Sequence, residues 1–383
     1  MTEINLDQMR KDIDSIDSKL TDLFRQRMEK SLEIAKYKQE NNIAVLNDTR
    51  EKEILHKVSE QIGEPFDGYA RLLFNTIFDA SRSCQNNYLA RKSDLAQRIQ
   101  NALDETPQLF PKKAVVACQG VAGSHSQAAC EKLFEVPSIM YFNSFEGVFT
   151  AVEKGLCQYG ILPIENSSYG SVGTVYDLMQ NYNFHIVKGI RLRISHNLMA
   201  KPGTKMSDIK EIVSHEQAIG QCGDFLKDLK DVKITICENT AIAAKIVAES
   251  DRNDIAAISS KECVDLYGLE ILKKHIQISD NNYTRFICIS KKLEIYPGAN
   301  RISLILSLPH VPRSLYHTIA KFAALGVNLT KLESRPIPGS DFEFMFYFDL
   351  DASVYSPELI NLLSELESQP ETFVFLGCYT EAI

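Results

Sequence analysis

The sequence predicts three consecutive domains of different fold class: an all-helical domain, an α/β domain and an α+β domain. Helical periodicity extends almost without interruption through residues 1–90. Over residues 113–292, short β-rich runs alternate with amphipathic helical stretches, which is typical of an α/β domain. Residues 299–383 follow the order strand, helix, strand, strand, helix, strand, which is ferredoxin-like. A charged connector at 91–112 separates the first two domains, and a length of 383 residues fits this division.

Composition and motifs exclude several classes of function. The formal net charge of -8 argues against a surface for nucleic acid or anionic membranes. No run approaches 18 apolar residues, and the N-terminus lacks a basic start before an apolar segment, so we expect neither a membrane span nor a signal peptide. The nine cysteines are scattered without a CxxC motif, which is typical of reduced thiols in the cytoplasm. Because GxGxxG and P-loop motifs are also missing, we expect no metal and no other cofactor.

A long amphipathic helix is predicted from about Asp7 to Glu40. Its apolar residues repeat at three- and four-residue spacing: Leu6, Met9, Ile13, Ile16, Leu20 and Leu23. Such a helix is roughly 50 Å long, which indicates packing along a partner helix. The next position of this seam is Arg27, and Lys38 lies about 20° away around the axis. A buried cation needs an anion, so the pair favours an anion site, with a surface arginine as the alternative for Arg27 alone.

A third helix of this region, roughly Asp67 to Leu89, carries two polar residues within an apolar stripe. The stripe has i,i+4 spacing and consists of Leu73, Ile77, Ser81, Gln85 and Leu89. A buried Ser or Gln is usually satisfied locally. Together with Arg27 and Lys38, however, Ser81 and Gln85 predict a polar pocket inside a helical bundle.

These residues occur in a specific combination: MRKxIDxID at 9–17, Arg27, Lys36, Lys38, NxxRE at 47–51, Ser81 and Gln85. The combination resembles the all-helical chorismate mutase family over about 85 residues. The resemblance implies that Arg10 and Arg27 bind the two carboxylates of chorismate. It also implies that Lys38 and Gln85 donate hydrogen bonds to the ether oxygen of the breaking bond.

The remaining residues of the resemblance concern the ring hydroxyl of the substrate. The family implies that Glu51 binds this hydroxyl with Ser81 nearby, and Asn47 stands where the family usually has Asp. The rearrangement to prephenate needs no nucleophile and no proton transfer. It needs a dianion held in one conformation and stabilised negative charge on the ether oxygen, and these residue types supply both.

The spacing of two arginines predicts the quaternary structure. Arg10 precedes Arg27 by 17 residues, or roughly 25 Å along a straight helix. One small ligand cannot contact both residues of the same helix. We therefore expect Arg10 to act from a second subunit, in a homodimer or a dimer of dimers with shared sites.

The α/β region contains four polar loops at the ends of its predicted strands. They read QGVAGSHS at 119–126, PIENSSxGS at 163–171, SHEQxxxQC at 214–222 and YTRF at 283–286. Taken singly, each is typical of a turn or a helix cap, and the first also fits an anion cradle at a helix N-terminus. In this order they resemble the prephenate dehydratase family over about 180 residues.

This resemblance implies two α/β lobes like those of periplasmic binding proteins, with the site between them. We place one lobe at about 113–192 with a return strand near 284–290, and the other at about 193–268. The resemblance implies that Thr284 assists departure of the ring hydroxyl of prephenate, which also loses carbon dioxide to give phenylpyruvate. We interpret Thr284 as a hydrogen-bond donor to the leaving oxygen, with a relay from water or Glu165.

The resemblance also implies a set of substrate-binding residues in the loops. The set is Ser124, Ser126, Glu165, Asn166, Ser167, Ser214, Gln217, Gln221 and Arg285. For Arg285 the sequence leaves two interpretations open, a carboxylate anchor or a structural ion-pair partner. His125 stands where the family usually has an aromatic residue.

Near the C-terminus, GVNLTxxESRP at 326–336 resembles the phenylalanine-binding ACT domain of this enzyme family. The resemblance implies L-phenylalanine as an effector bound by Ser314, Leu315, Asn328, Leu329, Glu333 and Ser334. One turn reads Pro312-Arg313-Ser314-Leu315 where the family has glycine at the second position, which questions the affinity for the effector.

Three functions therefore compete. The first is a cytoplasmic chorismate mutase fused to a prephenate dehydratase. A fusion to prephenate dehydrogenase is opposed by the missing dinucleotide motif. A non-catalytic amino-acid sensor of the same architecture is opposed by the full set Arg10, Arg27, Lys38, Gln85 and Thr284, which a sensor does not need.

Overall fold

The computed structural model describes residues 6–41, 43, 47–89, 94–337, 343–368 and 372–382. Residues 91–93 of the predicted connector lie outside this set. The chain forms two compact units. The first contains Met1–Arg98, Leu308–Gly326 and Tyr355–Phe373, and the second contains Ile99–Ser307, Val327–Val354 and Val374–Ile383. The predicted C-terminal domain is thus divided, with its helices in the first unit and its strands in the second.

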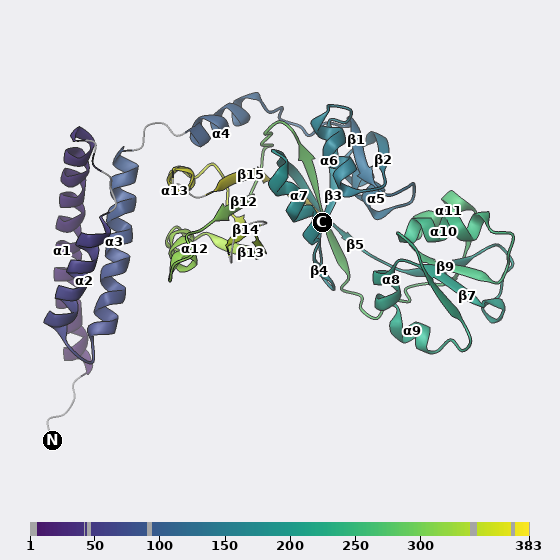
Figure 1. Cartoon of the computed structure of the whole chain (residues 1–383), viewed down its shortest axis with the longest axis horizontal. Helices are drawn as coiled ribbons and strands as arrows, with labels where there is room; N and C mark the ends of the chain where they lie inside the picture. Colours follow the sequence, from purple (N-terminus) through teal and green to yellow (C-terminus); the bar gives the residue numbers. More distant parts are fainter. Residues whose placement is uncertain are drawn as a thin grey trace, which may run out of the picture. The chain divides into compact units, whose positions relative to one another are not determined.

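The helices of the first unit are α1 (Leu6–Glu40), α2 (Asp48–Ile62), α3 (Asp67–Leu89), α12 (Ser314–Ala324) and α13 (Pro357–Glu367), and α4 (Asp94–Glu105) crosses the boundary between the units. Figure 1 shows α1, α2 and α3 lying side by side. The long first helix and the third helix are confirmed. The six apolar seam residues of α1 are each 48–61% exposed, so the residues that the structure describes leave this seam uncovered.

The second unit begins with a seven-stranded sheet, which we call lobe 1 together with its helices. Its strands are β1 (Lys113–Gln119), β2 (Val136–Phe142), β3 (Tyr159–Asn166), β4 (Gly170–Ser171), β5 (His185–Arg193), β11 (Tyr283–Ser290) and β16 (Glu381–Ala382). The order is β16-β5-β11-β3-β1-β2, with β4 paired to β3. Strand β11 runs antiparallel to both neighbours, as a return strand must. The helices are α5 (His125–Leu133), α6 (Phe145–Glu153) and α7 (Gly173–Asn181).

Lobe 2 is built on a five-stranded sheet with the order β10-β6-β9-β7-β8. Its strands are β6 (Asn197–Ala200), β7 (Glu211–Ser214), β8 (Lys233–Ile236), β9 (Ile255–Ser259) and β10 (Glu270–Lys273). Its helices are α8 (Glu216–Gln221), α9 (Gly223–Lys227), α10 (Thr240–Glu249) and α11 (Glu262–Tyr267), with the 3-10 helix η1 (Met206–Asp208). Because β10 pairs with β6, lobe 2 extends beyond the expected end at residue 268.

The C-terminal sheet consists of β12 (Arg301–Ser307), β13 (Asn328–Pro336), β14 (Phe344–Asp351) and β15 (Phe373–Tyr379), in the order β13-β14-β12-β15. One face of this sheet packs against lobe 1, since Ile305, Tyr347 and Leu376 share a core with Tyr176 and Ile186. The backbones approach closely at Gly377, where an added Cβ would lie 2.3 Å from the Ile186 carbonyl oxygen. Glycine at this position therefore allows the sheet to dock.

Within the described part of the chain, no helix is both long and apolar enough to cross a membrane.

Candidate active sites

The first candidate site lies among α1, α2 and α3. The guanidinium of Arg27 donates a hydrogen bond to the Ser81 hydroxyl, which connects α1 to α3. Burial lowers the pKa of Arg27 and of Lys38, and the carboxylate of Glu51 on α2 acts on both cations in the opposite direction. Two partly desolvated cations therefore share one carboxylate, which leaves a cationic surplus. Such a cluster suits an anionic ligand.

Gln85 lies one turn beyond Ser81 on α3 and is 7% exposed. Its amide oxygen is buried and has no hydrogen-bond partner among the described residues. The described protein groups therefore leave the Gln85 amide oxygen free to accept a hydrogen bond. An amide offers two donors and one acceptor, so Gln85 can bind a polar ligand atom here.

Two residues predicted for the helical site, Arg10 and Asn47, have contacts that differ from those of the buried cluster. The Arg10 side chain is 68% exposed and lies 3.6 Å from Asp7, so within this chain it is not part of the cluster. The Asn47 side chain caps α2, because its amide oxygen accepts a hydrogen bond of 3.0 Å from the Arg50 backbone N–H. The side chain of Asn47 therefore has a structural role in starting α2.

The sequence analysis missed Arg82 in this site. The Arg82 guanidinium binds the carboxylates of Glu51 and Asp79. It therefore fixes the carboxylate that faces the two cations. The available signal was the i,i+3 pair Asp79 and Arg82 on the predicted third helix.

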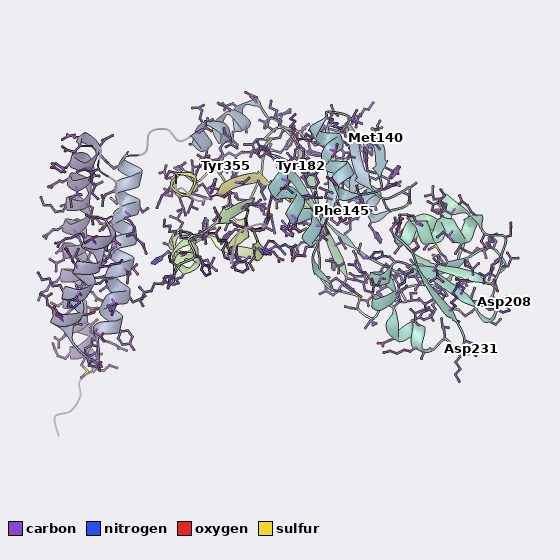
Figure 2. The ribbon with its side chains drawn as sticks, in the orientation of Figure 1. Met140, Phe145, Tyr182, Asp208, Asp231 and Tyr355 are labelled. Atoms are coloured by element: carbon purple, nitrogen blue, oxygen red, sulfur yellow. The ribbon has the colours of Figure 1, made fainter. Side chains whose placement is uncertain are left out.

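The second candidate site is a cleft of about 330 Å³ lined by residues of both lobes. Six predicted residues line it: Ser124, Ser126, Asn166, Gln217, Gln221 and Thr284. The prediction had assigned no role to the other lining residues, which include Gln119, His125, Phe145, His196, His215, Glu238, Asn239 and Thr240. Phe145, labelled in Figure 2, begins α6. Gln119, His125 and His215 lie within the polar loops noted in the sequence, and Asn239 carried a further signal, since Asn before a helical run indicates an N-cap.

Thr284 and Asn166 both line the cleft and are hydrogen-bonded to each other. Asn166 Oδ1 accepts hydrogen bonds from the backbone N–H groups of Ser168 and Tyr169, which fixes the orientation of the amide. Its Nδ2 group donates to Thr284 Oγ1 at 2.9 Å. Because the Thr284 oxygen accepts this bond, its own proton remains available to a ligand in the cleft.

A chain of amides and an imidazole extends from this pair into lobe 2. Asn166 Nδ2 also donates to Asn282 Oδ1 at 3.0 Å, and Asn282 Nδ2 donates to Gln221 Oε1 at 2.9 Å. The same Gln221 oxygen lies 2.6 Å from His196 Nε2. The network links the return strand of lobe 1 to α8 of lobe 2, so it connects Thr284 and Asn166 to both walls of the cleft.

A β-bulge in β3 determines which side chains of this strand face the cleft. Arg285 pairs with Glu165 and Phe286 with Pro163, which leaves Ile164 as the extra residue. The extra residue shifts the alternation of side chains. As a result, Asn166 and Pro163 both line the cleft although they are three positions apart.

The lining contains no Lys or Arg among the residues that the structure describes. An anion in the cleft would instead meet helix N-termini, hydroxyls, amides and imidazoles, and Glu238 is the acidic residue of the described lining. Ser124 caps α5 and Asn239 caps α10, and both residues line the cleft. Backbone N–H groups at such ends bind anions.

The three histidines of the lining are poor proton acceptors. Burial, and then the neighbouring His196, lower the pKa of His125 to about 4. Burial also lowers the pKa of His196 and of His215. All three imidazoles are therefore neutral at pH 7, where they act as hydrogen-bonding groups and not as cations.

Four residues predicted to contact the substrate, Glu165, Ser167, Ser214 and Arg285, are not among the residues that line the cleft. Glu165 and Arg285 point to the opposite face of their strands, where they bind Lys331 and Asp349 of the C-terminal sheet. For Arg285 this selects the structural ion pair of the two interpretations. The Ser167 hydroxyl donates to the Asn281 carbonyl, and the buried Ser214 hydroxyl donates to the Ile258 carbonyl.

The residues predicted for an effector lie in both units. Ser314 and Leu315 begin α12 in the first unit, whereas Asn328, Leu329, Glu333 and Ser334 lie on β13 in the second. The Glu333 carboxylate accepts a hydrogen bond from the Ser171 hydroxyl of lobe 1. Arg313 precedes α12 with a φ of 77°, the left-handed region that favours glycine.

In the part of the chain that the structure describes, no three His, Cys, Asp or Glu side chains form a group that could hold a metal ion.

Comparisons with known proteins match both the helical region and the α/β region of the chain. Residues 116–294 match the family model of prephenate dehydratase, and residues 9–86 match that of chorismate mutase type II. Arogenate dehydratase/prephenate dehydratase 2 of Arabidopsis thaliana is 37% identical over 276 residues, which cover 69% of this chain and 72% of that protein. The bifunctional chorismate mutase/prephenate dehydratase of Escherichia coli strain K12 is 29% identical over 381 residues, which cover 97% of this chain and 95% of that protein.

A solved structure agrees as well. The prephenate dehydratase from Arthrobacter aurescens, in complex with L-Phe, superposes with a TM-score of 0.64 at 28% identity. The superposition covers 70% of this chain and 90% of that one. The chain therefore belongs to the prephenate dehydratase family, in the bifunctional form that carries a chorismate mutase region before the dehydratase.

Proposed function

We propose that this protein catalyses two consecutive steps of phenylalanine biosynthesis, from chorismate to prephenate and from prephenate to phenylpyruvate. One observation carries the proposal: a single chain holds a cationic helical cluster and a separate hydroxyl-centred cleft. The two match the needs of a rearrangement and of an elimination. We place both activities in the cytoplasm.

In the mutase step the protein binds and polarises, and the substrate supplies the reacting bonds. Arg27 binds one carboxylate of chorismate, and Arg10 of a second subunit binds the other. Lys38 and Gln85 donate hydrogen bonds to the ether oxygen, where negative charge develops as the bond breaks. Glu51, held by Arg82, accepts from the ring hydroxyl.

In the dehydratase step Thr284 assists the leaving hydroxyl. The carbon–carbon bond to the ring carboxylate breaks, its electron pair enters the ring, and the carbon–oxygen bond breaks. Carbon dioxide leaves, and the departing hydroxyl takes one proton from the solvent to form water. Thr284 donates a hydrogen bond to this oxygen, while Asn166 holds the Thr284 oxygen in place.

We propose feedback regulation by L-phenylalanine through an ACT-like C-terminal domain of ferredoxin-like fold. The order of strands and helices from β12 to β15 supports this assignment, as does the L-Phe complex of the Arthrobacter enzyme. Arg313 stands at the turn where a backbone approach needs space, so we expect weak binding of the effector.

We propose a homodimer, alone or as a dimer of dimers, formed along the apolar seam of α1. The exposed seam and the position of Arg10 far from Arg27 both support this assembly. A second copy of α1 would cover the seam and supply the missing arginine.

A single incubation tests the proposed function. Purified protein receives chorismate alone, and the products are followed by chromatography over time. We expect prephenate first and phenylpyruvate afterwards, while the Thr284→Ala variant stops at prephenate. Wild-type protein that forms neither product would support a non-catalytic sensor, and protein that stops at prephenate would contradict the dehydratase assignment.

A further inference from the structure

Two cross-strand pairs of opposite charge face each other where the C-terminal sheet meets lobe 1. In lobe 1, Glu165 of β3 is paired with Arg285 of β11. In the C-terminal sheet, Lys331 of β13 is paired with Asp349 of β14. These four residues, which we call the charge quartet, all belong to the second compact unit.

The contacts within the charge quartet connect each residue to one of opposite sign in the other sheet. Lys331 Nζ lies 2.8 Å from Glu165 Oε1, and Arg285 binds Asp349 at 2.5 Å. Arg285 and Glu165 lie 3.9 Å apart, which joins the two ion pairs. Exposure of the side chains is 6% for Arg285, 11% for Asp349, 11% for Lys331 and 36% for Glu165.

Further polar groups complete the surroundings of Arg285. Its guanidinium donates to the Tyr379 hydroxyl at 2.7 Å and lies 3.3 Å from the Glu381 carboxylate. The Ser303 hydroxyl donates to Asp349. Removing one partner from such a buried set leaves an uncompensated charge. The set therefore holds the two sheets in one relative position.

The charge quartet is one residue away from the catalytic pair. Thr284 and Asn166 form the adjacent cross-strand pair, directly before Arg285 and after Glu165. Successive side chains of a strand point to opposite faces. The two strand ends therefore present Thr284 and Asn166 to the cleft on one face and Arg285 and Glu165 to the C-terminal sheet on the other.

We propose that Lys331 and Asp349 are positioning residues for the dehydratase reaction. They act through Glu165 and Arg285, and they hold the ends of β3 and β11 so that the Thr284 hydroxyl keeps its contact with Asn166. The C-terminal sheet is thereby part of the support of the cleft, and a shift of β13 reaches the catalytic hydroxyl through one ion pair. This inference rests on the proposed dehydratase function.

The test compares Lys331→Met with a matched control on the same strand. Arg335 lies four positions along β13 and also reaches lobe 1, where it binds Asp177 of α7 at 2.8 Å. It touches neither β3 nor β11 in these contacts, so Arg335→Met removes a similar ion pair without releasing the catalytic strands. Both variants, Lys331→Arg and the wild type are assayed with prephenate for kcat and KM, and each is followed by thermal unfolding.

We expect Lys331→Met to lower kcat about 10-fold to 100-fold with little change in KM, because misplacement of a reacting group acts on the chemical step. Arg335→Met should keep the wild-type kcat, and Lys331→Arg should recover most of it. The second variant, Asp349→Asn, should also lose kcat, since it leaves Arg285 without its closest anion. The mutase rate of each variant, measured with chorismate, should stay unchanged.

Two results would overturn the inference. One is a folded Lys331→Met protein with wild-type kcat, whatever its melting temperature. The other is an equal loss of kcat in Arg335→Met, which would reveal a general effect of docking. Failure of the proposed function is distinguishable, because wild-type protein would then not consume prephenate at all.

Discussion

The helical site and the cleft treat negative charge in opposite ways. The helical site gathers Arg27 and Lys38 around one carboxylate. The polar lining of the cleft consists of hydroxyls, amides, neutral imidazoles and the carboxylate residue Glu238, with no Lys or Arg among its described lining. Both proposed substrates are dianions, so the charge of the substrate does not explain the difference. The reaction does.

A rearrangement keeps both carboxylates, so cations can bind them equally in the ground state and the transition state. A decarboxylation destroys one carboxylate. A cation beside that carboxylate would stabilise the ground state more than the transition state and would slow the reaction. A cleft without Lys and Arg therefore suits prephenate, and binding falls to groups with partial charges such as helix N-termini.

The two sites also differ in completeness. The cleft assembles within one compact unit, where a continuous hydrogen-bond network connects Thr284 to His196. The helical site has one of its predicted arginines exposed far along α1. A second subunit is thus expected to matter for the mutase and not directly for the cleft.

The largest expected effect separates the two activities. Thr284→Ala should lower dehydratase kcat by about 10³-fold, because it removes the donor to the leaving oxygen, and should leave the mutase rate intact. Lys38→Ala should lower mutase kcat by about 10²-fold to 10³-fold and spare the dehydratase. Separate assays with chorismate and prephenate measure both, with Thr284→Ser as the control that restores a hydroxyl. Loss of both activities in one folded variant would refute the two-site comparison.

The next effect concerns how Gln85 supplies its hydrogen bond. An amide donates at every ordinary pH, whereas a glutamate donates only when protonated, with a reference pKa of about 4.3. The wild-type mutase rate should therefore be nearly flat between about pH 5 and 8, apart from other groups. Gln85→Glu should reduce the rate at pH 8 by about 10²-fold and recover as the pH falls. An unchanged pH–rate profile in the variant would show that Gln85 does not touch the ether oxygen.

A smaller effect tests the shared mutase site. Arg10→Ala and Lys38→Ala chains are each inactive by themselves, but a heterodimer holds one site without either lesion if Arg10 acts from the partner. Random exchange of subunits should thus restore about a quarter of wild-type mutase activity. Exchange is verified by mass spectrometry of differently tagged chains. Proven exchange without recovery would place the complete site within one chain.

The sequence predicted the helical site better than the cleft, because helical periodicity places residues on one face. The seam of α1 that leads to Arg27 and the stripe of α3 that contains Ser81 and Gln85 each extend over three or more turns of regular helix. The hydrogen bond from Arg27 to Ser81 joins the two helices, as expected for one shared pocket. Arg82 escaped notice because its role depends on contact with Glu51 of another helix.

The cleft was harder to predict, because features outside the local sequence determine to which face of a strand each side chain points. A single extra residue at Ile164 reverses the alternation in β3. Docking of the C-terminal sheet then gives Glu165 and Arg285 partners more than 60 positions away. His196 lies in a connection between the lobes and had no pattern to mark it.

The smallest expected effect uses the neutral histidines of the cleft. The pKa of His125 is about 4 in the folded protein, mainly because of burial, against an ordinary value near 6.5. Between these two pH values the unfolded chain binds a proton that the folded chain does not. Stability should therefore be highest above pH 6.5 and fall as the pH drops toward 4, by on the order of 3 kcal/mol from this group. His125→Gln cannot take up that proton, so its melting temperature should decline less over this range, by about 5 °C.

Some decline should remain in the His125→Gln variant, because burial also lowers the pKa of His196. Thermal unfolding at several pH values measures the slopes, with His310→Gln, at an exposed position outside the cleft, as the matched control. Equal slopes for wild type and His125→Gln would mean that His125 is not held neutral in the cleft, and the contrast with the cationic helical site would then have to rest on the missing Lys and Arg alone.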